Sequence, residues 1–416
     1  MREVSRQPPS VVDSTEGEEM DEARQVELFT DTVGGRLSRA VWPAATATLL
    51  ELHHRPGAGV SGLYELSDGT SVRYLVATSE DLPAGSGTPL PGDDVDLVWW
   101  EHPADPKLPG LATASVPETV ERIWGRGSPL EHLETVTYRP LRRAVLRARL
   151  GGETLYLKVL RRDADQLAAR HRLLLEAGVP APPVVGPVTD EVVALATVPG
   201  SPLAQALRDS PTLPLPAAAI LNLVDAFPVD LLEMSSRHAW TDRIDAYADA
   251  AAVAVPAAAA RIAATVARIH AVTGAVERGP LAPTHGDLYE ANLFVEAGRI
   301  SGVIDVDGAG PGYLVDDLAC FVAHVSVLPT IDEGYAHTAA FADAYLRAFG
   351  DELEERGISR AGLLARTAAV VLTLVAGARD ETLADWEATA LARIRLAEGY
   401  AAQAWGLLRV TRPFGE

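Results

Sequence analysis

The sequence has only one cysteine, Cys320, among its 416 residues, so no disulfide bond can form within the chain. This composition fits a reducing compartment, and the apolar run LACFVAHVSVL around Cys320 predicts a buried structural thiol. The sequence also lacks long hydrophobic runs: it has no stretch of eighteen apolar residues, and its N-terminus has no apolar signal-peptide core. We therefore expect a cytoplasmic protein without a membrane-spanning segment.

Basic residues are scarce as well. The chain has 36 Lys and Arg against 57 Asp and Glu, which gives a net charge of −21. Binding to nucleic acid or to an anionic membrane surface requires clustered positive charge, so we expect neither partner. The acidity suits a cationic small substrate, and it equally suits simple solubility. With 48% apolar and 22% charged residues, the chain has the balance of a globular protein, and its length predicts two or three packed units.

The first 125 residues divide into two predicted parts. Residues 1–25 are polar and acidic and contain Pro8 and Pro9, which predicts a disordered tail. Residues 26–125 contain short apolar runs (ATLLEL, SGLYEL, SVRYLVAT and VDLVWW) separated by Gly, Pro and Asp, and these predict a small antiparallel sheet. The proline-rich segment EHPADPKLPGLATAS cannot hold regular structure for long and predicts a connection to the next unit.

The remainder of the chain predicts an α+β fold. In residues 126–200, RRAVLRARL and ETLYLKVL predict a hairpin across Gly151 and Gly152, ADQLAARHRLLLEAG predicts a helix, and EVVALATVPG predicts another strand. Residues 201–416 are rich in Ala and Leu at helical spacing. One stretch, LAPTHGDLYEANLFVEAGRISGVIDVDGAGPGY, interrupts the helices and predicts two short strands around the EAGR turn.

The loop and hairpin of this interruption carry the chemistry. HGDLYEANL places Asp287 five residues before Asn292, and the second strand ends at Asp305. We expect the three side chains to meet at one end of the hairpin. Carboxylate and amide oxygens suit Mg²⁺, whose coordination is normally completed by phosphate oxygens, so the pattern indicates a nucleotide. Each residue also has a structural interpretation: Asp287 and Asp305 as caps, and Asn292 as a partner of the loop backbone.

Three motifs, HGDLYEAN, IDVDGAG and the later DDLA, resemble the aminoglycoside phosphotransferase and related small-molecule kinase family, over about residues 130–405. The resemblance implies a bilobal protein-kinase-like fold, with residues 126–200 as the nucleotide-binding N-lobe and residues 201–416 as the helical C-lobe that holds the catalytic loop and the acceptor site. It also makes residues 26–125 an additional β-rich cap subdomain, as in some maltokinase-like or aminosugar (glucosamine) kinase-like relatives.

The resemblance implies that Asp287 orients the acceptor hydroxyl and accepts its proton, while Asn292 and Asp305 hold Mg²⁺ on the phosphates of ATP. Asp307 is either a further metal ligand or a residue that tightens the DVDG turn. His285 is either a metal ligand or, as we favour, a structural histidine bound to the loop backbone.

Lys158 occupies the family position of the phosphate-contacting lysine. The partner of this lysine is usually a Glu on the next helix, and the polar candidates here do not match that position: Asp163, Asp165, Gln166 and Glu176.

Two further nucleotide contacts are expected. Where many relatives have a glycine-rich loop, this chain has TYRPLRRAVL, and Arg142 and Arg143 are either phosphate ligands or solvent-facing strand residues. The segment from Ala196 to Gly200 resembles the hinge that binds the base through its backbone, with Ala196 and Val198 as the contacts.

The sequence departs from protein kinases, because Gly286 follows His285 and only about ten residues separate Asp305 from the next predicted helix. A small acceptor is the better hypothesis. The candidate residues of the acceptor pocket are Trp240, Asp242, Asp380, Trp386 and Glu387. Alternatively, these residues are half-buried and only contribute to packing. The predicted function is ATP- and Mg²⁺-dependent phosphorylation of a hydroxyl of a sugar or aminosugar. The alternatives are an aminoglycoside or other antibiotic kinase, and a non-catalytic pseudokinase module.

Overall fold

The computed structural model describes residues 22–55, 58–92, 95–379 and 385–411. Within it the chain forms two compact units. The first contains Met1–Val120, Leu133–Leu146 and Val159–Arg161, and the second contains Glu121–His132, Arg147–Lys158 and Arg162–Glu416. Residues 1–21 of the predicted tail lie outside the described residues, and the predicted domain boundaries stay a prediction.

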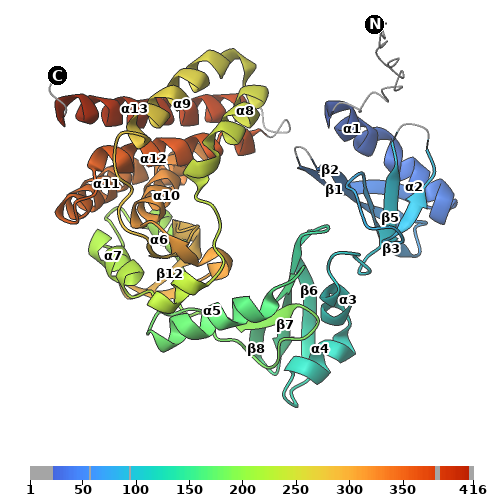
Figure 1. Ribbon diagram of the computed structural model, residues 1–416. Coiled ribbons are helices and arrows are strands. Elements are labelled where there is room, and N and C mark those ends of the chain that lie inside the picture. Colours follow the sequence, from blue (N-terminus) through green and yellow to red (C-terminus); the bar gives the residue numbers. More distant parts are fainter. Residues whose placement is uncertain (1–21, 56–57, 93–94, 380–384, 412–416) are drawn as a thin grey trace, which may run out of the picture. The chain divides into compact units, whose positions relative to one another are not determined.

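The first unit contains the predicted small antiparallel sheet, which is confirmed. Its five strands are ordered β1-β2-β3-β5-β4, and Figure 1 draws them in blue. They are β1 (Thr46–Arg55), β2 (Gly59–Ser67), β3 (Val72–Thr78), β4 (Thr88–Leu90) and β5 (Leu97–Glu101). One face of the sheet buries Tyr64, Leu66 and Leu75 against helical residues that include Phe29 and Leu37. This burial of apolar side chains stabilises the unit.

The helices that cover this face were not predicted. Helix α1 (Glu22–Leu28) begins inside the predicted tail and continues through the π-helical turn η1 (Phe29–Val33) into α2 (Gly34–Val41). Phe29, Val33 and Leu37 recur at intervals of four residues and are fully buried, which is the spacing of one helix face. The acidic residues around them concealed this period in the sequence.

The connection after β5 contains one short helix, α3 (Gly110–Ser115), at the end of the proline-rich segment, and α4 (Pro117–Trp124) follows it. Pro109 stands at the N-cap of α3 and Pro117 is the first residue of α4. Proline is tolerated at these positions because the first N–H groups of a helix have no intrahelical acceptor.

The next sheet is confirmed with one addition. Its order is β6-β7-β8-β9, in which β7 (Arg143–Leu150), β8 (Glu153–Leu160) and β9 (Val192–Ala196) match the predicted strands. Helix α5 (Ala164–Glu176) follows β8 as predicted. Strand β6 (Leu130–Arg139) was missed because only one of its ten residues is buried, so the strand lacks the alternation of buried and exposed positions.

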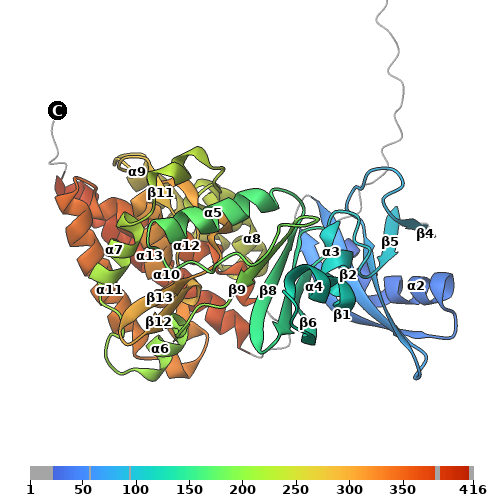
Figure 2. The same cartoon turned by 90° about the horizontal axis from the view of Figure 1, so that it is seen from below.

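The helical part of the second unit surrounds α10 (Leu314–Val327) and α12 (Arg360–Thr373), which are buried on almost every side. Figures 1 and 2 show the helices from α8 onward gathered in one bundle, coloured yellow to red. The other helices are α6 (Leu203–Asp209), α7 (Ala217–Asp225), α8 (Ile244–Ala254), α9 (Ala259–Thr273), α11 (Thr338–Glu355) and α13 (Trp386–Thr411). None of the described helices is both long and apolar enough to cross a membrane.

The predicted hairpin within the helical part is confirmed as β12 (Leu293–Glu296) and β13 (Arg299–Val303), with β10 (Ser201–Pro202) paired to β12. Strands β11 (Ala282–Thr284) and β14 (Gly310–Gly312) pair next to it. The predicted α+β class, with sheets in the N-terminal region and helices in the C-terminal region, is thereby confirmed. The two strand pairs present the HGDLYEAN and IDVDGAG loops side by side.

Tyr64 provides a test of the first unit. Its buried hydroxyl donates a hydrogen bond of 2.6 Å to the Phe29 carbonyl and so joins β2 to the helical segment. Replacing Tyr64 with Phe leaves that carbonyl without this bond, and we expect the free energy of unfolding to fall by about 1–3 kcal/mol. Urea denaturation measures the change. Tyr74→Phe, at an exposed position of β3, is the matched control, and an equal effect of both substitutions would contradict the role of the buried bond.

Candidate active site

The loop with the HGD motif is held by a buried carboxylate. Strand β11 ends at Thr284, and the next two backbone amides, of His285 and Gly286, donate to the two oxygens of Asp317 at 2.7 and 2.9 Å. Asp317 belongs to the first turn of α10 and is only 2% exposed. Burial raises the pKa of this carboxyl to about 7, against the opposing effect of the two amide donors. The DDLA motif thus anchors the loop to the central helix.

Gly286 brings two loops into contact. Its φ of +79° lies in the left-handed region, and a Cβ at this position would lie 2.9 Å from the carbonyl oxygen of Gly308. Any larger residue is therefore excluded both by conformation and by space. The backbone after His285 consequently lies directly against the DVDG turn.

His285 is a structural residue in this geometry. Its side chain is fully buried, and Nε2 lies 3.0 Å from the carbonyl oxygen of Ile304. Burial lowers the pKa of His285 to about 4, so the ring is neutral and donates this bond from Nε2. The histidine therefore joins its own loop to the residue before Asp305, which supports the structural interpretation over a metal ligand.

The structure brings Asp287, Asn292 and Asp305 to the same end of the hairpin. The Asn292 side-chain amide donates to the Asp287 carbonyl at 3.0 Å, and the Ile304 amide donates to the Asn292 carbonyl at 2.9 Å. Asp305 has φ +57° and ψ +40°. This left-handed conformation is uncommon outside glycine and is concentrated at functional sites.

Lys158 reaches the same place from β8. Its Nζ lies 2.9 Å from Oδ1 of Asp305 and 2.6 Å from Oδ1 of Asp307. Burial opposes the charge of Lys158, but the carboxylates of Asp307 and Asp305 outweigh it and raise its pKa. The lysine therefore stays charged, with its partners on the DVDG turn.

This pairing differs from the helix partners considered in the sequence. Asp163 precedes α5 and pairs with the neighbouring Arg162 at 3.4 Å, while Asp165, Gln166 and Glu176 form no ion pair with Lys158 among the described residues. The contacts of Lys158 span about 150 positions of the chain. No local pattern reveals a contact of that kind.

The donor set around Asp305 is suited to a shared metal ion. Within the described ranges, no group of three or more His, Cys, Asp or Glu side chains is placed to hold a metal ion. The carboxylates of Asp305 and Asp307 and the amide oxygen of Asn292 are hard oxygen donors, of the type that binds Mg²⁺ together with ligand oxygens. Both carboxylates also accept from Lys158 Nζ.

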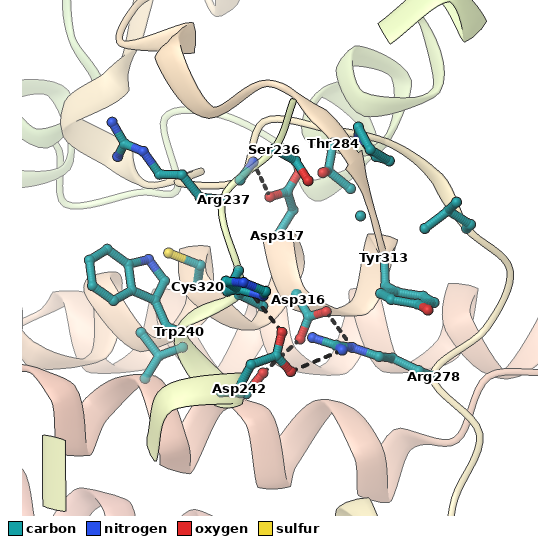
Figure 3. Close-up of a pocket in the computed structure, with 18 residues that line it drawn as sticks. Ser236, Arg237, Trp240, Asp242, Arg278, Thr284, Tyr313, Asp316, Asp317 and Cys320 are labelled. Atoms are coloured by element: carbon teal, nitrogen blue, oxygen red, sulfur yellow. Dashed lines mark hydrogen bonds and ion pairs between the residues drawn. The ribbon is translucent and has the colours of Figure 1, made fainter. Parts of the chain in front are cut away.

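A pocket of about 180 Å³ adjoins Gly286 and the HGD loop. In its wall, Arg278 forms ion pairs with Asp242 (3.0 Å) and Asp316 (2.8 Å), and its guanidinium lies over the Tyr313 ring at 4.4 Å. Figure 3 shows this network on one side of the pocket and Trp240 on another. Each pocket carboxylate of the network therefore already has a cationic partner.

Other predicted residues are distributed more widely. Trp240 and Asp242 line the pocket, and the indole Nε1 of Trp240 donates to Oδ1 of Asp287 at 3.2 Å. Trp386 and Glu387 begin α13 and are not among the residues that line this pocket. Asp380 lies outside the described residues.

The predicted nucleotide contacts remain predictions. Arg142 forms an ion pair with Glu80 at 3.6 Å within the first unit, and Arg143 begins β7. Ala196 ends β9 and donates its N–H to the Pro183 carbonyl, and Val198 lies against Gly302 of β13.

Sequence reasoning missed Arg278, Tyr313 and the pocket role of Asp316. Arg278 and Tyr313 lie in loops without a recognised motif, and Asp316 was noted only as part of DDLA. Two ion pairs bring these residues together in the pocket. Arg278 is 36 positions after its partner Asp242 and 38 positions before its partner Asp316.

The model of the phosphotransferase enzyme family (APH) matches residues 136–361. This range is more than half of the chain and contains Lys158, both loops and the DDLA motif. The chain belongs to this family. The resemblance predicted from the motifs is therefore confirmed, and the protein is a phosphotransferase enzyme that acts on a small molecule.

The phosphotransferase is also similar to solved structures. A thermostable mutant of aminoglycoside phosphotransferase APH(4)-Ia, in ternary complex with ADP and hygromycin B, has 17% identity and a TM-score of 0.47, covering 70% of this chain and 98% of that chain. Choline kinase from Cryptosporidium parvum Iowa II has 12% identity, coverages of 65% and 89%, and a TM-score of 0.44. Macrolide 2'-phosphotransferase MphH from Brachybacterium faecium has 20% identity, coverages of 68% and 97%, and a TM-score of 0.38. No curated protein matches the sequence.

Because His285 is buried, we expect the free energy of unfolding to decrease as the pH falls below neutral. The unfolded chain protonates this histidine below its ordinary pKa of 6.5, whereas the folded phosphotransferase keeps it neutral down to about 4. The unfolded state therefore gains protons first as the pH falls, and the free energy of unfolding decreases between pH 6.5 and 4. At pH 5 this effect amounts to about 2 kcal/mol.

His285→Gln keeps a donor for the Ile304 carbonyl but has no titrating ring. We expect its free energy of unfolding to fall less between pH 7.5 and 5 than that of the wild type, by about 2 kcal/mol, in urea titrations. His132→Gln, at an exposed position of β6, is the matched control for the substitution itself. Identical slopes for all three proteins would contradict a neutral buried His285.

Proposed function

We propose that this phosphotransferase transfers the γ-phosphoryl group of ATP, with Mg²⁺, to a hydroxyl group of a sugar or aminosugar. The observation that carries the proposal is the meeting of Asp287, Asn292 and the Lys158–Asp305–Asp307 cluster at one end of a hairpin. A pocket opens beside the same loop. Phosphoryl transfer depends mainly on positioning and charge stabilisation, and this arrangement supports both.

In this proposal Asp287 orients the acceptor hydroxyl and accepts its proton. The Trp240 indole N–H, at 3.2 Å from Oδ1, restricts the rotation of the Asp287 carboxylate. The backbone of Asp287 is fixed from the other side by the Asn292 amide, at 3.0 Å. A base held on both sides needs little reorganisation before it receives a proton.

The proposed nucleotide site uses the other members of the cluster. The oxygens of Asn292 and Asp305, with Asp307 as a further ligand, hold Mg²⁺, and Lys158 contacts the phosphates. Mg²⁺, when bound, neutralises the phosphate oxygens. Arg142 and Arg143 are proposed as additional phosphate ligands, and the backbone of Ala196 and Val198 as the contact for the base.

The pocket favours a small, ring-shaped acceptor. Its volume of about 180 Å³ is below the roughly 300–1,000 Å³ of sites that enclose drug-sized molecules. Trp240 and Tyr313 offer aromatic faces to a sugar ring. Asp242 and Asp316 are already paired with Arg278, so the pocket has no excess of bare carboxylates to attract a polycation. These features support a monosaccharide more than a polyamine antibiotic.

An acceptor panel tests the proposal. We expect ADP release in the presence of Mg²⁺ and ATP with neutral sugars or aminosugars, and weaker release with aminoglycosides and amino alcohols. Asp287→Asn should lower kcat by about 10²- to 10⁴-fold, because the base is lost, while nucleotide affinity changes by less than about threefold. Nucleotide binding is measured by titration calorimetry. If Asp287→Asn abolishes nucleotide binding, or if no acceptor supports turnover while ATP binds with Mg²⁺, the assigned roles are wrong.

The metal assignment has a separate test. Asp305→Ala removes a proposed ligand and a partner of Lys158, so nucleotide binding should lose most of its dependence on Mg²⁺. Calorimetric titrations with Mg²⁺ and with EDTA measure this dependence. Asp163→Ala, at the exposed start of α5, is the control and should retain it. An Asp305→Ala protein with wild-type Mg²⁺ dependence would place the metal elsewhere.

A further inference from the structure

One buried arginine contacts both sides of the proposed reaction centre. Arg170 lies in the middle of α5 and is 5% exposed. Its Nε donates to the carbonyl oxygen of Ala309 at 2.8 Å. Its Nη2 donates to the carbonyl oxygen of Ser235 and, at 3.0 Å, to the hydroxyl of the same serine. A single guanidinium thus joins two segments that are 74 residues apart in the chain.

These two segments have different proposed roles, one in binding the metal and the other in binding the acceptor. Ala309 follows Asp307 by two residues and terminates the turn that carries the proposed metal ligands. Ser235 directly precedes the segment 236–242, which lines the pocket and contains Trp240 and Asp242. Figure 3 shows Ser236, Arg237 and Trp240 of this segment around the pocket. We call 235–242 the acceptor segment and 305–310 the metal turn.

We propose that Arg170 is a positioning residue that fixes the acceptor segment against the metal turn. This inference rests on the proposed function, because it assigns the two segments to the acceptor and to the metal-bound phosphates. Arg170 holds the distance between them by binding a backbone carbonyl of each. The acceptor hydroxyl and the phosphoryl group are then presented in a fixed geometry, which in-line transfer requires.

The chemistry of the contact requires a guanidinium. Its planar, forked N–H groups donate in two fixed directions at once, whereas an ammonium is a compact point charge without that fork. Gln166, one helical turn before Arg170, adds a contact, because its side-chain oxygen accepts from the Ser235 hydroxyl at 3.2 Å. Helix α5 therefore binds the acceptor segment through two residues of one face.

A simpler role for Arg170 is to balance the charge of Asp307. Burial lowers the pKa of Arg170, and the Asp307 carboxylate opposes this effect. A lysine at position 170 preserves the charge but not the fork. The two roles therefore predict different behaviour for Arg170→Lys: charge balance predicts rescue, whereas positioning predicts a loss close to that of Arg170→Met.

The experiment compares Arg170→Lys and Arg170→Met with Arg172→Lys and Arg172→Met in the full-length protein. Arg172 is exposed on the same helix and serves as the matched control. With the best sugar acceptor, we expect both Arg170 variants to raise the acceptor KM on the order of tenfold, since a bond to a charged group is lost. The KM for ATP and the Mg²⁺ dependence of nucleotide binding should stay within about threefold. The Arg172 variants should match the wild type.

A second measurement needs no acceptor and no turnover. Hydrogen–deuterium exchange should be faster in residues 235–242 of both Arg170 variants, because α5 no longer restrains that segment. Exchange in α13 should be unchanged, which distinguishes local release from general unfolding. Ser235→Ala removes the hydroxyl but keeps the carbonyl, so it should raise exchange less than Arg170→Met does.

Two results would overturn the inference. The first is an Arg170→Lys protein with the kinetics and the hydrogen–deuterium exchange of the wild type. That result would show that Arg170 only balances the charge of Asp307. The other is a uniform rise of exchange throughout the second unit, which would make Arg170 a general stability residue. Failure of the proposed function is distinguishable: the wild type would then neither transfer phosphate to the panel nor bind nucleotide with Mg²⁺. The exchange measurement would still decide whether Arg170 restrains the acceptor segment.

Discussion

The site depends first on the carboxylate of Asp317, which is buried at the start of α10 and accepts the amides of His285 and Gly286. Charged groups are costly to bury, so such a residue is retained only where several donors compensate it. The two amides provide part of that compensation, and the beginning of a helix contributes further positive potential. Because most residues of α10 are buried, this carboxylate attaches the HGD loop to the interior of the second unit.

Three further contacts connect the loop held by Asp317 to the metal turn and to β8. Gly286 allows the loop to touch the metal turn, His285 binds the residue before Asp305, and Lys158 donates to both carboxylates of the turn. Each contact joins backbone or charge to a neighbouring segment, and none depends on a long flexible side chain at the surface. In the proposed mechanism, the fold itself therefore positions the catalytic groups, as electrostatic catalysis requires.

The sequence predicted those parts whose signals are local. The antiparallel strands, α5, the hairpin of β12 and β13 and the HGDLYEAN loop all have periodicity or motif spacing that neighbouring residues determine. Helices α1 to α4 were missed because each has only six to eight residues, too few for a clear helical period. Contacts between distant segments, such as Lys158 with Asp307 or Arg170 with Ser235, depend on tertiary folding. A residue at one position does not indicate its partner 60 to 150 positions away.

The salt-bridged floor of the pocket has a consequence for the evolution of specificity. Arg278 is the shared partner of Asp242 and Asp316, and Arg366 is the other cation near Asp316, at 3.7 Å. Loss of the one arginine would leave two carboxylates facing the pocket with most of their compensation removed. A single replacement of Arg278 would therefore make the pocket more negative, and the pocket would then attract cationic molecules more strongly.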